Sequence, residues 1–174
     1  MAFKHVLVPT DFSESANHAL RCAAEEALLH RAKVTILHVH PSEARTDVYY
    51  VTGAPPSGFE AGFDVVAGGR LAAAAVSEPT VVRHDYIEET LTRLRDLVPD
   101  AFRGTWEVEI AVGRPADTIV RFARERQVDL IVMATHGRTG LEHVVLGSVA
   151  EKVVRLAPCP VLTVKYRGNT PDKR

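Results

Sequence analysis

Small residues recur at a fixed spacing near the C-terminus. Residues 134–137 read Ala-Thr-His-Gly, and after nine further residues come Gly147 and Ser148. Glycine is common in loops that hold phosphate, because backbone N–H groups can reach a ligand only where no side chain blocks the approach. The apolar run 129–133 predicts a buried parallel strand, and residues 148–154 predict a helix. The pattern therefore indicates a phosphate-binding loop between a strand and a helix.

The composition indicates a single soluble-type domain and argues against nucleic acid or a membrane as a partner. A chain of 174 residues with 46% hydrophobic residues suits one domain, which buries roughly 70% of its unfolded surface. The formal net charge of −1 gives no overall field that would attract nucleic acid or an anionic membrane. Cys22 and Cys159 form no CxxC pair, which fits a reducing compartment. Because no stretch approaches the ~18 apolar residues of a transmembrane helix, we expect a cytoplasmic protein.

Strand and helix patterns alternate along the chain. Apolar runs predict strands at 5–8, 33–39, 106–112, 129–133 and 161–165. Helical spacing of apolar residues predicts helices at about 11–30, 85–98, 115–123 and 148–155. This order predicts a single α/β domain with a doubly wound, Rossmann-like parallel sheet of five strands in the order 3-2-1-4-5. In strand 106–112 apolar and polar residues alternate, so we expect an edge strand with one face exposed.

Three chain segments are expected to meet beyond this sheet. In doubly wound sheets a ligand binds beyond the C-terminal ends of the strands, where the strand order reverses. The ends of the first and fourth strands, Pro9-Thr10-Asp11 and residues 134–137, would meet there, with Val39 of the second strand beside them. The sequence therefore places the candidate site at this edge of the sheet.

The segment 40–83 contains too many glycines and prolines for one regular element. Loops of this length are functional lids or solvated excursions. We favour a solvated excursion with at most one short helix around 70–76, and a lid remains the alternative because the segment leaves next to the candidate site. The domain is expected to span residues 1–166, followed by a polar tail at 167–174.

The assembled motifs closely resemble the universal stress protein family. The matching segments are 6–13, 37–39, 135–140 with 147–148, and 157–162, and the resemblance covers the chain apart from the excursion and the tail. It implies the adenine nucleotide alpha hydrolase-like version of the Rossmann-like fold. ATP-binding members carry glycine, two residues, glycine, nine residues, and then glycine with serine or threonine. Here Gly137, Gly147 and Ser148 match, whereas Ala134 stands at the first glycine.

The resemblance also implies a bound adenine nucleotide, which would be ATP, ADP or AMP. Val39 would offer backbone groups to the adenine edge, and Asp11 would hydrogen-bond the base or the ribose. Gly137, Gly147, Ser148 and Val149 would hold phosphates, and Arg138 would reach an outer phosphate. Mg²⁺ could bind through the phosphates and Ser148. The complete set of expected nucleotide-binding residues is Pro9, Thr10, Asp11, Val39, Met133, Ala134, His136, Gly137, Arg138, Gly140, Gly147, Ser148 and Val149.

Several of these residues have simpler alternative roles. Asp11 and Glu14 match a capping box at the start of the first helix, and Ser148 with Glu151 matches another. His38 and His40 lie on the same side of a strand, but no carboxylate or cysteine at ligand spacing completes a metal site, so we expect structural or cavity-lining histidines. A structural hydrogen-bonding role is likewise favoured for His136.

No catalytic constellation is recognisable in the sequence. The turn after the first strand contains no glycine, and there is no GxxxxGK[ST] loop. We therefore expect a nucleotide-binding regulatory stress protein that acts on an unknown protein partner, without catalytic residues. The alternatives are a dimeric interaction module that binds no nucleotide and a slow ATPase. The apolar edge strand Val161–Val164 predicts a homodimer, which is common in the family.

Overall fold

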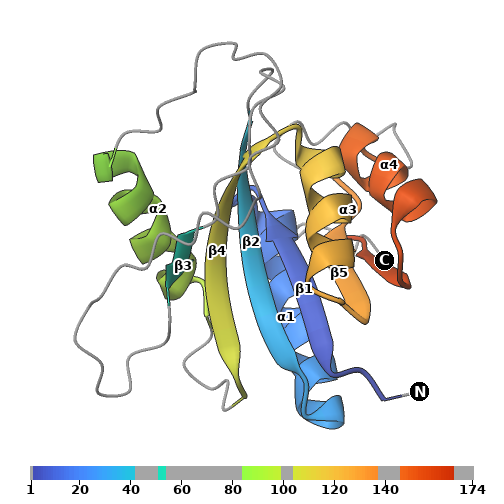
Figure 1. Ribbon diagram of the computed structural model, residues 1–174. Helices are drawn as coiled ribbons and strands as arrows, with labels where there is room; N and C mark the ends of the chain where they lie inside the picture. Colours follow the sequence, from blue (N-terminus) through green and yellow to red (C-terminus); the bar gives the residue numbers. More distant parts are fainter. Residues whose placement is uncertain (1, 42–50, 54–83, 99–103, 137–145, 167–174) are drawn as a thin grey trace, which may run out of the picture.

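Parallel strands and helices alternate along the chain in the computed structural model (Figure 1), which describes residues 2–41, 51–53, 84–98, 104–136 and 146–166. The predicted excursion, with its short helix or lid, lies outside the described residues apart from 40–41 and 51–53, and so does the tail 167–174. The elements in chain order are β1 (His5–Thr10), α1 (Glu14–His30), β2 (Lys33–Pro41), β3 (Val51–Gly53), α2 (His84–Asp96), β4 (Trp106–Gly113), α3 (Pro115–Glu125), β5 (Leu130–Ala134), α4 (Ser148–Leu156) and β6 (Val161–Val164).

The sheet has the predicted topology with one additional strand. Its order is β3-β4-β2-β1-β5-β6, and the five strands other than β3 are parallel. The prediction of a five-stranded parallel sheet in the order 3-2-1-4-5 is therefore confirmed. The additional strand β3 pairs antiparallel with residues 108–110 of β4. It comes from the glycine- and proline-rich segment, where three residues are too short a run to show a strand pattern.

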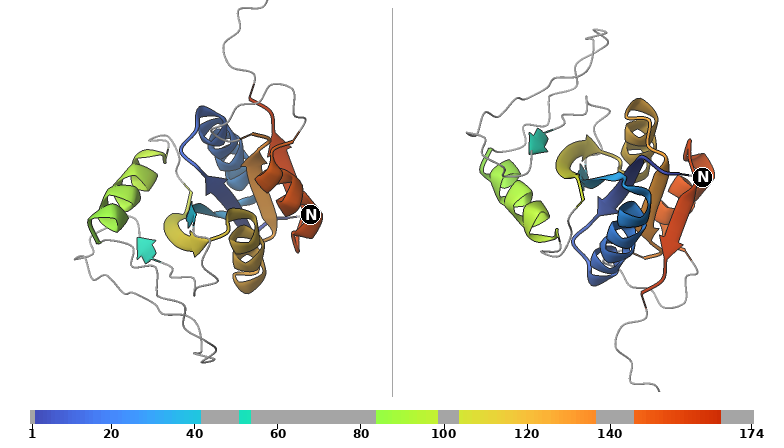
Figure 2. Two further views of the ribbon diagram at one scale, coloured as in Figure 1. Left: turned by 90° about the horizontal axis from the view of Figure 1, so that it is seen from above. Right: turned by 90° about the horizontal axis from the view of Figure 1, so that it is seen from below.

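Helices cover both faces of the sheet, with α1 and α2 on one side and α3 and α4 on the other (Figure 2). Successive residues of β1 enter opposite cores: Val6 and Val8 pack with α1, whereas Leu7 packs with α3 and α4. Strands that are buried on both faces read as continuous apolar runs, which is why these strands could be recognised in the sequence. Pro115 begins α3, as predicted, where its missing N–H leaves no helical hydrogen bond unmade.

The predicted cap of α1 is wrong. The N-cap residue is Ser13, whose side-chain oxygen accepts a hydrogen bond from the Ala16 backbone N–H at 3.2 Å. Asp11 lies two residues earlier, and its carboxylate accepts a hydrogen bond from the Ser13 N–H at 3.1 Å. Both residue types cap helices well, so the spacing alone did not distinguish them. Asp11 therefore shapes the turn before the helix, next to the end of β1.

The expectation that one face of β4 is exposed is also wrong. Residues 108–113 are all buried, and the Glu109 side chain is 0% exposed. β3 pairs along part of the outer edge of β4, and Arg126 covers Glu109 from the end of α3. The alternation of glutamates along this strand therefore reflects a buried polar network and not a solvated face.

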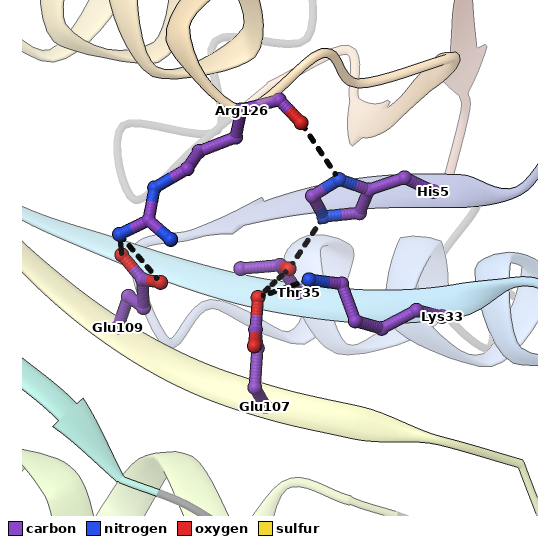
Figure 3. A network of polar contacts seen from close by, with 6 residues as sticks. All are labelled: His5, Lys33, Thr35, Glu107, Glu109 and Arg126. Carbon is purple, nitrogen blue, oxygen red and sulfur yellow. Dashed lines mark hydrogen bonds and ion pairs between the residues drawn. The ribbon is translucent and has the colours of Figure 1, made fainter.

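That network joins three strands at their N-terminal ends (Figure 3). Lys33 Nζ and Thr35 Oγ1 both donate hydrogen bonds to Glu107 Oε1, at 2.9 and 2.7 Å. The His5 ring bridges the network, with Nε2 2.7 Å from Thr35 Oγ1 and Nδ1 3.2 Å from the Arg126 carbonyl oxygen. These contacts connect β1, β2 and β4 to the chain that follows α3.

The two glutamates of this network have opposite shifts in pKa. Burial raises the pKa of Glu109 to about 7, although Arg126 opposes the shift with Nη2 3.3 Å from Oε1. Burial also acts to raise the pKa of Glu107, but the hydrogen bonds from Lys33 and Thr35 outweigh it and the pKa lies below its usual range. Burial, with Lys33 nearby, lowers the pKa of His5. Glu107 is thus a satisfied carboxylate, and Glu109 is a carboxyl group close to its titration point at neutral pH.

Candidate functional site

A cavity of about 580 Å³ lies at the C-terminal ends of β1, β2 and β5, the edge of the sheet that the sequence predicted. Ten of the expected site residues line it: Pro9, Thr10, Asp11, Val39, Met133, Ala134, His136, Gly147, Ser148 and Val149. The other three, Gly137, Arg138 and Gly140, lie outside the described residues. The fold thus gathers side chains from distant parts of the chain around one space that could hold a small molecule.

The turn after β1 forms one wall of the cavity. The Phe12 N–H donates a hydrogen bond to Thr10 Oγ1 at 3.0 Å, and Phe12 has φ of 66°. Residues other than glycine seldom adopt this left-handed conformation, so the local contacts must hold it in place. The Phe12 ring lies 4.6 Å from the His38 ring, between centroids. The turn therefore places the Asp11 carboxylate and an aromatic ring side by side on the wall.

The end of β2 forms the second wall. The β2 pairing with β1 ends at His38, so residues 39–41 extend beyond β1, while their pairing with β4 continues. The His38 Nδ1 donates a hydrogen bond to the Thr10 carbonyl oxygen at 2.9 Å, and His40 Nδ1 lies 2.9 Å from the Tyr86 hydroxyl oxygen of α2. Both histidines line the cavity. Their contacts agree with the structural, cavity-lining role that the sequence favoured over a metal pair.

The end of β5 is held to α4 by a close backbone approach. The Gly147 N–H donates a hydrogen bond to the Thr135 carbonyl oxygen at 2.7 Å. A Cβ atom at Gly147 would lie 3.1 Å from that same oxygen, so a side chain would push the two segments apart. The His136 carbonyl oxygen accepts a hydrogen bond from Ser15 Oγ at 2.9 Å, which ties this loop to α1. Glycine at position 147 thus permits this close backbone approach, which a side chain would widen by a few tenths of an ångström.

The N-terminus of α4 faces the cavity without a side-chain cap. Gly147 is the N-cap residue, and no side chain makes a capping hydrogen bond there, so the predicted capping box of Ser148 and Glu151 is wrong. The Glu151 N–H donates to the Gly147 carbonyl oxygen at 2.8 Å as the first helical bond. The N–H groups of residues 148–150 precede that bond, and the helix dipole adds a positive potential there. This end of α4 can therefore hold an anionic group.

The sequence did not predict the wall that α2 contributes. Tyr86 and Arg93 of α2 line the cavity together with Phe12, and so do Pro115 and Ile119 of α3. The helical pattern of α2 was visible, but the sequence between the second strand and this helix gave no indication of where the helix would pack. Apolar spacing shows which face of a helix is buried, and not which polar side chains reach a distant cavity. Only the fold could bring these residues to the site.

The charged groups on the described wall are few. Asp11 is the one carboxylate and Arg93 the one lysine or arginine among the described residues that line the cavity. Within the same described ranges, no group of three histidine, cysteine, aspartate or glutamate side chains could hold a metal ion. The arrangement suits the binding of a small, partly anionic molecule by backbone groups and a few side chains.

In the parts of the chain that the structure describes, no helix combines the length and the apolar character needed to cross a lipid bilayer.

Comparison with known proteins agrees with the motifs. The model of the universal stress protein family matches residues 2–165. Universal stress protein MJ0531 of Methanocaldococcus jannaschii is 34% identical over 171 residues, which cover 94% of this chain and 82% of that protein. The solved structure of MJ0577, from the same organism, has a TM-score of 0.67 at 25% identity, over 97% of this chain and 99% of that one. A universal stress protein from Archaeoglobus fulgidus, solved in complex with dAMP, has a TM-score of 0.57 at 25% identity, over 95% and 100% of the two chains.

Proposed function

This chain belongs to the universal stress protein family, and we propose that its cavity binds an adenine nucleotide, ATP, ADP or AMP, as a regulatory ligand. The observation that carries the proposal is the convergence of ten expected site residues on one cavity of about 580 Å³. Such a volume lies within the roughly 300–1,000 Å³ of common small-molecule sites. The relative from Archaeoglobus fulgidus that was solved with dAMP supports an adenine nucleotide as the ligand class.

The phosphates would bind at the N-terminus of α4. The N–H groups of residues 148–150 have no partner within the helix, and the dipole of α4 favours negative charge at this end. Gly147 allows the backbone to come close to the loop after β5. Ser148 is exposed, so its hydroxyl could contact a phosphate or a Mg²⁺ ion that the phosphates hold. In this proposal, Gly137, Gly140 and Arg138 complete the phosphate site.

The adenosine part would lie between the ends of β1 and β2. Val39 would offer backbone groups to the adenine edge, and Asp11 would accept a hydrogen bond from the base or the ribose. Pro9 and Thr10 would form the floor, and the buried side chain of Met133 adds apolar surface. Ala134 is also on this wall, at the position where the ATP-binding pattern of the family has its first glycine.

Bound nucleotide would act by stabilising one conformation or one surface for a protein partner. The described wall holds one carboxylate and no cluster that would position water and a base for hydrolysis, so we assign no catalytic residue. Slow hydrolysis and a stress-response module that binds no nucleotide are the two alternatives. The following experiment separates nucleotide binding from the module that binds no nucleotide, and the appearance of ADP during incubation with ATP would indicate slow hydrolysis.

The test is to denature the purified protein and to identify released nucleotide by chromatography, followed by calorimetric titration of the nucleotide-free protein with ATP, ADP and AMP. We expect released ATP or AMP, or a micromolar dissociation constant for at least one nucleotide. A Gly147→Ala variant should lose this affinity, whereas Arg155→Gln, on an exposed part of α4, should retain it. Absence of both released nucleotide and binding heat would refute the proposal and favour the nucleotide-free module.

We further propose that two copies pair through β6, the last strand of the described sheet. Leu162 of β6 is exposed, and so are Val154 and Leu156 of α4, which packs against β6. An apolar edge strand is a template for pairing with a second copy. Light scattering should give the mass of a dimer, and Leu162→Arg should shift it towards the monomer. Leu29→Arg, at an exposed apolar residue of α1, serves as the control; a monomeric wild type at high concentration would overturn the proposal.

A further inference from the structure

Arg93 of α2 is a cationic side chain on the cavity wall that no sequence motif indicated. Its Cζ atom lies 4.2 Å from the centroid of the Phe12 ring. Stacking on an aromatic face fixes the plane of a guanidinium group and leaves the N–H donors at its edges available for another partner. The side chain is therefore oriented at the cavity before any ligand arrives.

The ring beneath Arg93 is itself held in place. Phe12 has the left-handed backbone conformation, its N–H is bonded to Thr10 Oγ1, and its ring contacts His38. Strained conformations outside glycine persist where surrounding contacts enforce them, and they cluster at ligand sites. The same turn that forms the wall of the cavity thus provides the platform for Arg93.

Arg93 has no acidic partner among the described residues, although Glu89 precedes it by four positions on α2. A glutamate at this spacing is a common ion-pair partner on a helix. In the structure Arg93 stacks on Phe12 instead, at the cavity, and it forms no ion pair with a described residue. A guanidinium group that faces a cavity without an ion pair favours an anionic ligand group, and phosphate matches its fork of donors well.

We propose that Arg93 binds a phosphate group of the ligand and selects phosphorylated nucleosides over unphosphorylated ones. The inference rests on the proposed nucleotide function and adds a second anion contact to it. The N-terminus of α4 acts from one wall of the cavity, and Arg93 acts from the α2 wall. A ligand whose phosphates reach both walls would contact both groups, whereas adenosine carries no phosphate for either.

The experiment is a calorimetric titration of the full chain with adenosine, AMP and ATP, on wild type, Arg93→Gln, Arg93→Lys and Arg95→Gln. Arg95 lies on the same helix and does not line the cavity, so Arg95→Gln is the matched control for the loss of one positive charge. We expect Arg93→Gln to weaken the better-bound phosphorylated ligand roughly tenfold, the size of one charge-assisted hydrogen bond, and to leave adenosine unchanged. Arg93→Lys should restore part of the loss, and added salt should shrink the difference.

Three other results of these titrations would overturn the inference, and each identifies which part of it is wrong. If the wild type binds nucleotide and Arg93→Gln binds it equally well, Arg93 makes no phosphate contact and the proposed function stands. If Arg93→Gln weakens adenosine and ATP by the same factor, Arg93 only shapes the cavity through Phe12. If the wild type binds none of the three compounds, both this inference and the proposed function are wrong. Thermal unfolding of each variant checks that the fold is retained.

Discussion

At the N-terminal ends of the parallel strands, charged side chains are paired with one another, whereas at the C-terminal ends polar groups line an open space. In the first region, Lys33 and Thr35 both donate hydrogen bonds to Glu107, at 2.9 and 2.7 Å. In the second region, the N-terminus of α4 has no side-chain cap and Arg93 has no acidic partner among the described residues. Both regions are polar, and His38 and His40 in the second region are hydrogen-bonded to protein atoms, but the protein supplies neither a side-chain cap for α4 nor an ion pair for Arg93 there.

This difference separates a structural polar cluster from a candidate binding site. Buried polar groups must find partners, and a network that finds them within the chain contributes to stability. Donors that face a cavity without a protein partner are available to a ligand. Substitutions in the network should therefore change stability as a function of pH. Substitutions at the cavity should change ligand affinity with little effect on stability.

The largest expected effect belongs to Glu109 of the network. Its pKa in the folded protein is about 7, above the ordinary 4.5, so protonated Glu109 favours the fold. That contribution is complete below about pH 4.5 and is lost as the pH rises through about 7, with a limit of about 3 kcal/mol. Glu109→Gln removes the titration. We compare the free energies of unfolding of the variant and the wild type, measured in urea. The variant minus wild-type difference should increase by up to about 3 kcal/mol as the pH rises from 4.5 to 8.

A constant difference between the two proteins across this pH range would show that Glu109 does not titrate in the fold. In that case, the Arg126 guanidinium would compensate the buried carboxylate fully, and the contrast between Glu109 and Glu107 would disappear.

Glu107 should show the opposite dependence on pH. Its folded pKa is lowered, because the hydrogen bonds from Lys33 and Thr35 outweigh burial. The ionised carboxylate therefore stabilises the fold above its ordinary pKa, and this stability is lost as the pH falls through the lowered value. Glu107→Gln should cost about 1–2 kcal/mol at pH 7, and the cost should shrink as the pH falls below the ordinary pKa of a glutamate, measured by the same urea titrations. A cost that does not change as the pH falls would point to packing in place of charge.

At the cavity, Gly147→Ala should weaken nucleotide binding about tenfold or more. The added Cβ would lie 3.1 Å from the Thr135 carbonyl oxygen, so the start of α4 must move relative to the end of β5. Backbone donors act on phosphate only at hydrogen-bond distance, and a shift of a few tenths of an ångström weakens them together. Calorimetry measures the affinity. Unchanged affinity in a folded variant would place the phosphates elsewhere.

The smallest effect is expected for Ala134→Gly. Ala134 ends β5 and its methyl group lines the cavity at the position of the first glycine in the ATP-binding pattern. If the methyl group crowds the ligand, glycine should lower the dissociation constant of ATP by about two- to threefold. The effect is small because one methyl group makes only a few weak van der Waals contacts. Identical dissociation constants for the two proteins would show that the alanine is harmless.

The fold could be predicted from the sequence because the strands are buried on both faces. Continuous apolar runs at β1, β2 and β5 show this burial directly, and the alternation with helices fixes a parallel order. The prediction was wrong for β4, where Glu109 is buried, because local alternation cannot reveal that Arg126 lies over it. It also missed β3, which has only three residues.

The candidate site could be predicted in part for a similar reason. Pro9, Val39 and Gly147 lie at strand or helix ends, and such ends can be located from local patterns. Arg93 could not be predicted, because its role depends on packing between α2 and the turn at Phe12. The two capping predictions were wrong because serine, aspartate and glycine all occupy N-caps, and neighbouring candidates compete.

The most direct test of the central claim is a ¹H–¹⁵N NMR titration of the full chain, first freed of co-purified nucleotide, with ATP and with AMP. The backbone amide signals of Val39, Gly147, Ser148 and Val149 should shift on binding, whereas those of Lys33 and Glu107 at the other end of the sheet should not. Saturating shifts confined to the cavity would establish it as an adenine nucleotide site. Unchanged spectra at millimolar nucleotide, or shifts centred on Lys33 and Glu107, would contradict the account.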